Sequence, residues 1–227
     1  MRRLILLILV FIIICYFQYN YINNTNNSYD ILQYENPNKA MFENIVKEKS
    51  ITILTHIPSD ELIYNKIHLR DFFKSTYDKM TPVQQSDISQ VITNNFKYYD
   101  IPLKTKHKSQ LYIQDKNICG QLKKQIYYRH LICVLKGTLK IALFSPNNEQ
   151  HLYFNNNISK VDIWNQDLKK YPNIEKAKYV EILLHENQLI YIPIHWIYST
   201  ITNDDCVYVS YSNESFFSSF LKNIKHT

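Results

Sequence analysis

Glycine is nearly missing from this chain, which has only Gly120 and Gly137 among its 227 residues. Phosphate-binding loops of the GxGxxG and GxxxxGK types and the serine nucleophile motif GxSxG need closely spaced glycines, so the sequence excludes all three. Alanine and arginine are also scarce, at three and four residues, against 31 Ile, 23 Asn and 22 Lys. This bias is typical of an AT-rich genome, as in some large DNA viruses and protists.

Four cysteines are present, and none of them lies in a CxxC or CxxH spacing. Structural zinc sites depend on such pairs, so the sequence predicts none. Cys15 lies in an apolar segment, which leaves Cys119, Cys133 and Cys206, and three cysteines allow at most one intramolecular disulfide. The chain is therefore not a disulfide scaffold, and with 45% hydrophobic and 20% charged residues it can bury an ordinary core.

The net charge is +6 and the isoelectric point is about 8.9. Nucleic-acid binding would need these charges to be clustered, because the affinity comes from neutralising neighbouring phosphates. The lysines are instead scattered singly or in pairs such as Lys123-Lys124 and Lys169-Lys170. We therefore do not expect nucleic acid as a partner.

The longest apolar run covers residues 4–17, which would be about 21 Å long as a helix. Extended to Ile22, the helix reaches about 28 Å, close to the roughly 30 Å of a bilayer core. Three tyrosines near its end would then lie among the lipid headgroups, where tyrosine is enriched. We expect an uncleaved transmembrane signal-anchor at residues 1–22, with the bilayer as its partner along residues 4–22.

A cleaved signal peptide and a buried helix are the alternatives to this anchor. Cleavage needs two small residues at a fixed spacing, and the sequence CYFQYNYINN after the apolar run does not provide them. Arg2 and Arg3 precede the run and no Lys or Arg follows until Lys39, which predicts a cytosolic N-terminus and a lumenal or exterior domain. Four N-x-Ser/Thr sequons would then be open to glycosylation, at Asn23, Asn26, Asn157 and Asn213.

Residues 23–40 are rich in Asn and have no hydrophobic period, so we expect a linker there and a folded domain at residues 41–227. Residues 50–54 favour a strand. Apolar spacing favours helices at residues 69–77, 87–96, 161–171 and 215–224. Short strands are predicted at residues 110–114, 129–135, 139–144, 178–184, 189–192, 196–202 and 205–211. The predicted fold class is mainly β with N-terminal helices, as a sandwich or barrel.

Two stretches carry a family resemblance. Residues 135–146 read LKGTLKIALFSP, and residues 159–201 contain VDIW, KKYPN and LIYIPIHW in this order. Together they resemble the cupin-like JmjC hydroxylases, which are iron(II)/2-oxoglutarate oxygenases on a double-stranded β-helix, a cupin-like jelly roll. The resemblance covers residues 109–202 and implies that fold, with Gly137 at the turn of the first strand pair.

The resemblance does not extend to the iron site. The family binds iron through His-x-Asp/Glu on one strand and a distant His on another, a triad that leaves positions open for 2-oxoglutarate and dioxygen. Counted from the turn glycine, the first pair falls on Lys124 and Ile126. The neighbouring register gives Lys123 and Gln125, and the distant His falls on Tyr198. Neither register supplies a ligand, so we predict no catalytic residue, no metal site and no cofactor.

Other residues near the predicted pocket are His130, Lys140, His195 and Trp196. The family's 2-oxoglutarate lysine falls one residue before Lys140, and a one-residue offset in a strand points a side chain to the opposite face. Trp196, like Trp164, either stacks on a ligand or packs in the core.

A relocated metal site is an alternative to the loss of iron. It would combine two of the three histidines His130, His185 and His195 with Asp162 or Glu186. Nothing in the spacing of these residues favours a facial arrangement, so each histidine is as well explained by a hydrogen-bonded turn position.

These observations predict a membrane-anchored, catalytically inactive relative of the hydroxylases, whose former pocket is partly filled by Lys124, Ile126 and Tyr198. It would act as a binding or structural module for an unidentified protein or small molecule. One alternative is an active hydroxylase of a protein substrate with moved ligands, needing iron(II) and 2-oxoglutarate. Another is a structural surface or virion membrane protein in which the fold is incidental.

Overall fold

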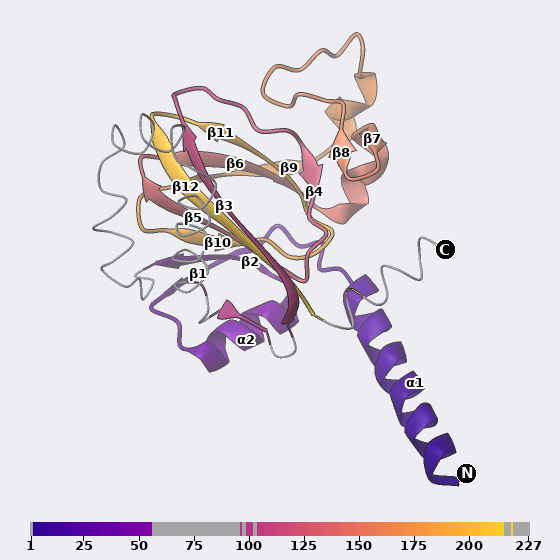
Figure 1. The fold of residues 1–227 in the computed structure, drawn as a ribbon. Coiled ribbons are helices and arrows are strands. Elements are labelled where there is room, and N and C mark those ends of the chain that lie inside the picture. Colours follow the sequence, from indigo (N-terminus) through magenta and orange to yellow (C-terminus); the bar gives the residue numbers. More distant parts are fainter. Residues whose placement is uncertain (1, 56–95, 97–98, 102–103, 216–218, 220–227) are drawn as a thin grey trace, which may run out of the picture.

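Two six-stranded sheets face each other in the computed structural model, which describes residues 2–55, 96, 99–101, 104–215 and 219 (Figure 1). The strand order of the first sheet is β1 (Ile31–Glu35), β2 (Ile51–Thr55), β10 (Leu189–Tyr191), β5 (Arg129–Lys136), β12 (Cys206–Ser215) and β3 (Lys104–Gln114). The order of the second is β7 (Phe154–Asn155), β8 (Ile158–Ser159), β4 (Lys123–Lys124), β11 (Ile197–Thr202), β6 (Leu139–Phe144) and β9 (Tyr179–Leu184). Neighbouring strands are antiparallel, except that β1 is parallel to β2.

The chain passes repeatedly from one sheet to the other between β3 and β12, as in a jelly roll. The predicted mainly β, cupin-like sandwich is therefore confirmed, and each predicted strand of the second half is present, with β3 and β12 longer than expected. Gly137 lies in the turn between β5 and β6 with φ 79°, as predicted. Side chains alternate along β6: Leu143 packs between the sheets, whereas Phe144 packs on the outer face.

Three hydrophobic clusters hold the layers together. The first lies between the sheets and includes Trp196 and Tyr198. The second covers the outer face of the first sheet, where Phe42 of α2 (Lys39–Glu48) packs near Leu131. The third covers the outer face of the second sheet with residues 152–177, which follow the 3-10 helix η2 (Pro146–His151) and include η3 (Pro172–Lys176).

The segment predicted as a linker, residues 23–40, is part of the folded domain, so that prediction is wrong. Within it β1 extends the first sheet, and α2 begins at Lys39 with the Asn38 side chain accepting a hydrogen bond from the Met41 amide at 2.9 Å. The Tyr29 hydroxyl accepts hydrogen bonds from the amide groups of Ser145 and the Asn148 side chain. The sequence analysis could not find these contacts, because the partners are far away in the sequence and the Asn-rich composition gives no periodic pattern.

Residues 161–171, predicted as helical, form turns instead. The Asp162 side chain accepts from the backbone amides of Trp164 (2.9 Å) and Asn165 (3.3 Å), and such local bonds compete with helix formation. The short helix η3 follows at Pro172. The helices predicted at 69–77, 87–96 and 215–224 lie almost wholly outside the described residues.

α1 (Arg2–Asn23) is a single helix that projects away from the barrel in Figure 1. Its apolar side chains are exposed, with Leu7 at 65% and Phe17 at 66%. It is long and apolar enough to cross a membrane by length and composition, a test that a signal sequence would also pass.

Candidate functional site

A chain of hydrogen bonds crosses the space between the two sheets. His130 of β5 is the centre: its Nδ1 lies 2.7 Å from the hydroxyl of Ser212 on β12, and its Nε2 lies 2.7 Å from the hydroxyl of Tyr198 on β11. All three side chains are buried. The first sheet thus contacts the second through a polar bridge at the position where the sequence predicts the pocket.

The pairing of β4 with β11 decides which lysine faces this space. Tyr198 is directly opposite Lys123, and Ile197 is opposite Lys124. Opposite residues of an antiparallel pair share a face, so Lys123 lies with Tyr198, its ammonium 5.0 Å from the ring centre. Lys124 turns to the other face and forms a 2.5 Å ion pair with Glu149.

The prediction that Lys124 fills the pocket is therefore wrong, and Lys123 takes that place. Ile126 lies beyond the end of β4, half-buried and outside the three hydrophobic clusters. Tyr198 is buried between the sheets as expected. The second of the two registers considered above, with Lys123 and Gln125, is the one consistent with this strand pairing.

Gln125 is buried, and its side chain forms hydrogen bonds with backbone groups. The amide nitrogen donates to the Tyr127 carbonyl at 2.8 Å, and the amide oxygen accepts from the Tyr127 backbone amide at 2.8 Å. An iron(II) ion placed by the family pattern would thus meet the ammonium of Lys123, an engaged amide and the phenol of Tyr198. None of these groups matches the histidine and carboxylate donors of the facial triad, so the residues present do not fit the metal.

Protonation states follow from burial. Burial, and then the neighbouring Lys123, lowers the pKa of His130 from 6.5 to about 3, whereas burial raises the pKa of Tyr198 well above 10.0. At neutral pH both groups are uncharged, and a neutral imidazole can accept from one hydroxyl and donate to the other. The bridge is a satisfied structural network rather than a base held ready for proton abstraction.

Acid should destabilise the protein through His130. The unfolded chain takes up a proton near pH 6.5, but the folded chain does not until about pH 3, so stability is full above pH 6.5 and falls as the pH drops towards 3. Between about pH 7 and pH 5 this group should remove about 2 kcal/mol from the free energy of unfolding. Urea unfolding at both pH values should show a smaller drop for His130→Gln. An equal drop in both proteins would refute the assignment.

The other predicted pocket residues are scattered. Lys140 lies on the outer face of β6, where its ammonium is 3.4 Å from the Glu181 carboxylate, so its placement in the pocket is wrong. His195 lies in the turn before β11, with Nε2 3.1 Å from the Ile22 carbonyl. Trp196 is buried in the cluster between the sheets. The outward direction of Lys140 follows from alternation along β6, because its neighbours Leu139 and Ile141 point inward.

The structure does not assemble the relocated metal site. His130 contacts two hydroxyls and His195 contacts a backbone carbonyl, while the Asp162 carboxylate caps a turn on the outer side of the second sheet. Over the part of the chain that the structure describes, no group of three or more His, Cys, Asp or Glu side chains is placed to hold a metal ion.

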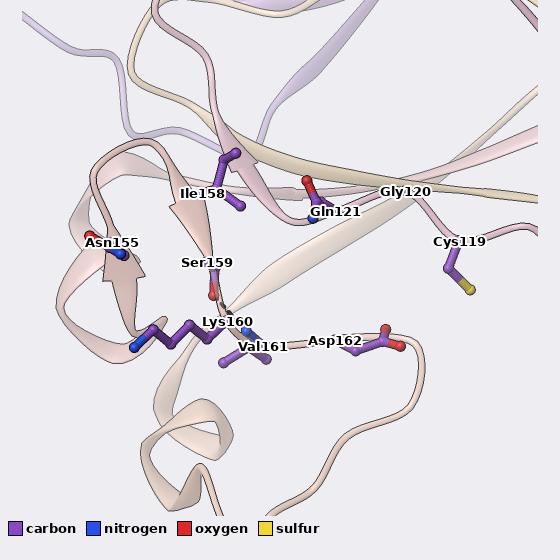
Figure 2. A pocket seen from close by; sticks show the side chains of 9 residues that line it. All are labelled: Cys119, Gly120, Gln121, Asn155, Ile158, Ser159, Lys160, Val161 and Asp162. Carbon is purple, nitrogen blue, oxygen red and sulfur yellow. Dashed lines mark hydrogen bonds between the residues drawn. The ribbon is translucent and has the colours of Figure 1, made fainter.

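A separate cavity of about 550 Å³ lies outside the barrel, beside β8 (Figure 2). It is lined by Cys119, Gly120, Gln121, Asn155, Ile158, Ser159, Lys160, Val161 and Asp162. Burial and the nearby Asp162 raise the pKa of the Cys119 thiol, which lowers the thiolate fraction and hence its nucleophilicity. The Ser159 hydroxyl donates to the Leu152 carbonyl. The cavity therefore presents no activated nucleophile.

The sequence reasoning missed Ser212 and did not single out Lys123 as the inward residue. Each lies on a strand that the pattern located or bordered, but its face depends on the partner strand. A weak signal existed for Ser212, because Ser210 and Ser212 alternate with Val209 and Tyr211 along β12.

The sequence pattern of the cupin-like domain family matches residues 21–219. Human tRNA wybutosine-synthesizing protein 5 is 34% identical over 76 residues, which are 33% of this chain and 24% of that protein. Lysine-specific demethylase 8 of Danio rerio is 32% identical over 76 residues, which are 31% of this chain and 19% of that protein. The chain thus spans a quarter or less of the length of these relatives.

A solved structure of dTDP-4-dehydrorhamnose 3,5-epimerase from Elizabethkingia anophelis aligns with a TM-score of 0.30 at 11% identity, over 48% of this chain and 50% of that chain. This likeness is too low to bear on the fold. The family pattern, in contrast, extends over most of the chain and includes the segment from the end of α1 to β12. Together with the two facing sheets and their strand order, it shows that the chain belongs to the cupin-like domain family.

Proposed function

We propose that this protein is a membrane-anchored cupin-like barrel that has lost iron-dependent oxygenase chemistry and serves as a binding module. One observation carries the proposal: Lys123 and Tyr198 face each other at the strand pair where the related hydroxylases hold iron, with the Lys123 ammonium over the Tyr198 ring. A fixed cation repels a metal cation at the same place. Two curated relatives are named as a tRNA-modifying protein and a demethylase, and this substitution argues against a comparable reaction here.

The full chain, purified in mild detergent, should retain no stoichiometric iron after dialysis against iron(II) and should make no succinate from 2-oxoglutarate. Elemental analysis and a succinate assay measure the two quantities. Stoichiometric iron in the unmodified chain would overturn the proposal.

A designed variant tests the same proposal by restoring metal-binding side chains. Lys123→His, Gln125→Asp and Tyr198→His together restore three donors in the register of the β4–β11 pair, and should retain iron. The matched control carries Lys124→His, Ile126→Asp and Tyr198→His. It should retain none, because Lys124 points away towards Glu149. Thermal unfolding of both variants checks that they are folded.

We also propose that α1 is the anchor and that the domain is lumenal or exterior. Exposed apolar side chains along α1 and the two arginines before it support this topology. The four sequons then differ in access. Asn157 is exposed in the turn between β7 and β8, whereas Asn213 is fully buried, with its amide 3.4 Å from Asp100.

Expression of the full chain in glycosylating cells should therefore add one glycan, at Asn157. The Asn26 side chain donates a hydrogen bond to the Glu48 carbonyl, so its amide is not free for glycosylation. Asn23 is the last residue of α1, so its amide lies too close to the membrane for glycosylation. A glycosidase-sensitive shift on gels should vanish in Asn157→Gln and persist in Asn213→Gln. No shift in the unmodified chain would place the domain on the cytosolic side and refute this topology.

A further inference from the structure

The C-terminal end of α1 is fixed to the domain by polar contacts. The Tyr21 hydroxyl donates to the Val46 carbonyl at 3.0 Å, and the Ile22 carbonyl is 3.1 Å from Nε2 of His195. The Lys49 ammonium donates to carbonyl oxygens at the end of α1, including that of Tyr21, and lies 4.4 Å from the Tyr21 ring centre. The helix therefore joins the barrel without a flexible stalk.

These contacts involve one end of the barrel. We call this end the rim: residues 125–128, between β4 and β5, and residues 193–196, between β10 and β11. Besides His195, the ring of Tyr128 contacts α1, with its centre 6.0 Å from that of Tyr21. The 22 residues of α1 span about 33 Å, enough to cross the apolar core of a bilayer. The rim then lies at the level of the lipid headgroups.

Two lysines lie beside this rim at strand positions on the inward faces of the sheets, Lys123 half-buried and Lys108 exposed to solvent. Lys123 is opposite Tyr198, whose hydroxyl reaches His130. On the other sheet, Lys108 of β3 is opposite Ser212, whose hydroxyl also reaches His130. The His130 bridge thus connects the two positions, and both ammonium groups belong to the same end of the barrel.

Neither lysine has a counter-charge among the described residues. The ion pairs there use Arg129 and the lysines Lys104, Lys124 and Lys140, whereas the Lys123 ammonium lies over the Tyr198 ring. Burial, and then repulsion from Lys108, lowers the pKa of Lys123. Glu214 of β12 also lies at this end: it is opposite Lys106 in the strand register, and after burial it raises the pKa of Tyr127 in the rim. It is one carboxylate against three lysines. An excess of positive charge therefore remains at the rim.

We propose that the rim binds the phosphate of an anionic lipid headgroup, held between Lys123 and Lys108. The inference rests on the proposed anchoring, because α1 brings the rim to the headgroup layer. A phosphate oxyanion offers several acceptor oxygens and the negative charge that two ammonium groups lack. The exposed Lys106, two residues before Lys108 on β3, adds a third ammonium group beside the rim.

The test uses the full chain in neutral detergent, titrated with short-chain phosphatidic acid, short-chain phosphatidylcholine or inorganic phosphate. Calorimetry gives the affinities, and the thermal midpoint gives the stabilisation. Phosphatidic acid should bind at least about tenfold more tightly than the other two, since it combines the charge with a position beside α1. High salt should weaken this binding.

Lys123→Met should reduce the affinity for phosphatidic acid by about tenfold. Lys108→Met, at an exposed position where folding is not at risk, should also weaken it. The matched control is Lys140→Met, which removes an equal charge from the outer face of β6 and should change nothing.

Equal binding of inorganic phosphate and phosphatidic acid would overturn the lipid assignment, and equal affinity in all three lysine variants would overturn the site. A separate measurement, extraction of membranes with alkaline carbonate, tests the anchor. If alkaline carbonate releases the full chain from membranes, the proposed function fails. If the chain stays in the membrane but phosphatidic acid does not bind, only this inference fails.

Discussion

Arg129→Ala should reduce the free energy of unfolding by about 2–4 kcal/mol, since it removes a buried guanidinium that pairs with a partly exposed carboxylate and donates to two backbone carbonyls. Arg129 is 2% exposed, and its guanidinium lies 2.5 Å from the Glu43 carboxylate on α2. It also donates to the carbonyls of Tyr99 at 2.8 Å and Asp100 at 3.2 Å. Alanine would leave these acceptors without the Arg129 donor and would remove the ionic contact between α2 and β5, whereas Phe42 would still pack on the sheet.

Urea unfolding of the full chain in mild detergent measures this loss. Lys140→Ala is the control, because the ion pair with Glu181 is 3.4 Å long and both side chains are more than one-third exposed. Such surface pairs contribute less than about 1 kcal/mol. If Arg129→Ala does not fold, Glu43→Gln should still lower stability by more than the control. Equal effects of Arg129→Ala and Lys140→Ala would contradict the structural role assigned to Arg129.

Gly137→Ala should be nearly as damaging, at roughly 2–4 kcal/mol. Gly137 has φ 79°, and a Cβ atom there would lie 2.4 Å from the Asp205 carbonyl oxygen and 3.2 Å from Cα of Cys206. Backbone atoms cannot move aside as a flexible side chain can. The β5–β6 turn would have to shift against the turn before β12, which would disturb both sheets.

Asn187→Gly is the matched control for Gly137→Ala. Asn187 lies in the turn before β10 with φ 64°, so glycine there relieves strain and should change stability by less than about 1 kcal/mol. Thermal midpoints of the two variants give the comparison. A loss of stability in Asn187→Gly as large as that in Gly137→Ala would show that these turns tolerate no change of residue, and would contradict the explanation by contact of a Cβ with Asp205.

Both glycines of this glycine-poor chain lie where a side chain has no room. A Cβ atom at Gly120 would be 2.5 Å from Oγ1 of Thr200. The sequence resemblance had given a reason only for Gly137, as a turn residue. The reason for Gly120 is a contact across the second sheet between residues 80 positions apart, such as the 2.7 Å hydrogen bond from the Gly120 amide to the Thr200 carbonyl, which no local pattern reveals.

Local patterns located the strands well because each strand is a short β-branched or aromatic run bounded by turn residues. β6 was predicted with its observed bounds, Leu139–Phe144. The same reasoning failed at residues 23–40 and 161–171. In the first, β1 is held by β2 and the chain by Tyr29 contacts with distant residues. In the second, the Asp162 side chain competes for the backbone amides that a helix would use.

The candidate site shows the same limit more sharply. The sequence placed Tyr198 at the position of the distant histidine, and the structure puts it between the sheets beside His130. The sequence could not decide whether Lys123 or Lys124 points inward, because two adjacent residues of a strand point to opposite faces and both registers fit the spacing. The pairing of Lys123 with Tyr198 settles which side chain faces inward.

By itself, the sequence determined that the chain is mainly β and that it has an apolar segment long enough for a membrane, and it predicted that no histidine or carboxylate occupies the positions where the resemblance places the family's ligands. Those properties depend on composition, on short-range periodicity and on residue identity at counted positions. Only the tertiary structure decided which lysine points inward, that His130 bridges the two sheets, and that the end of α1 contacts the rim. Each of these joins residues from different strands, and strand register is set by packing across the sheets rather than by neighbours in the chain.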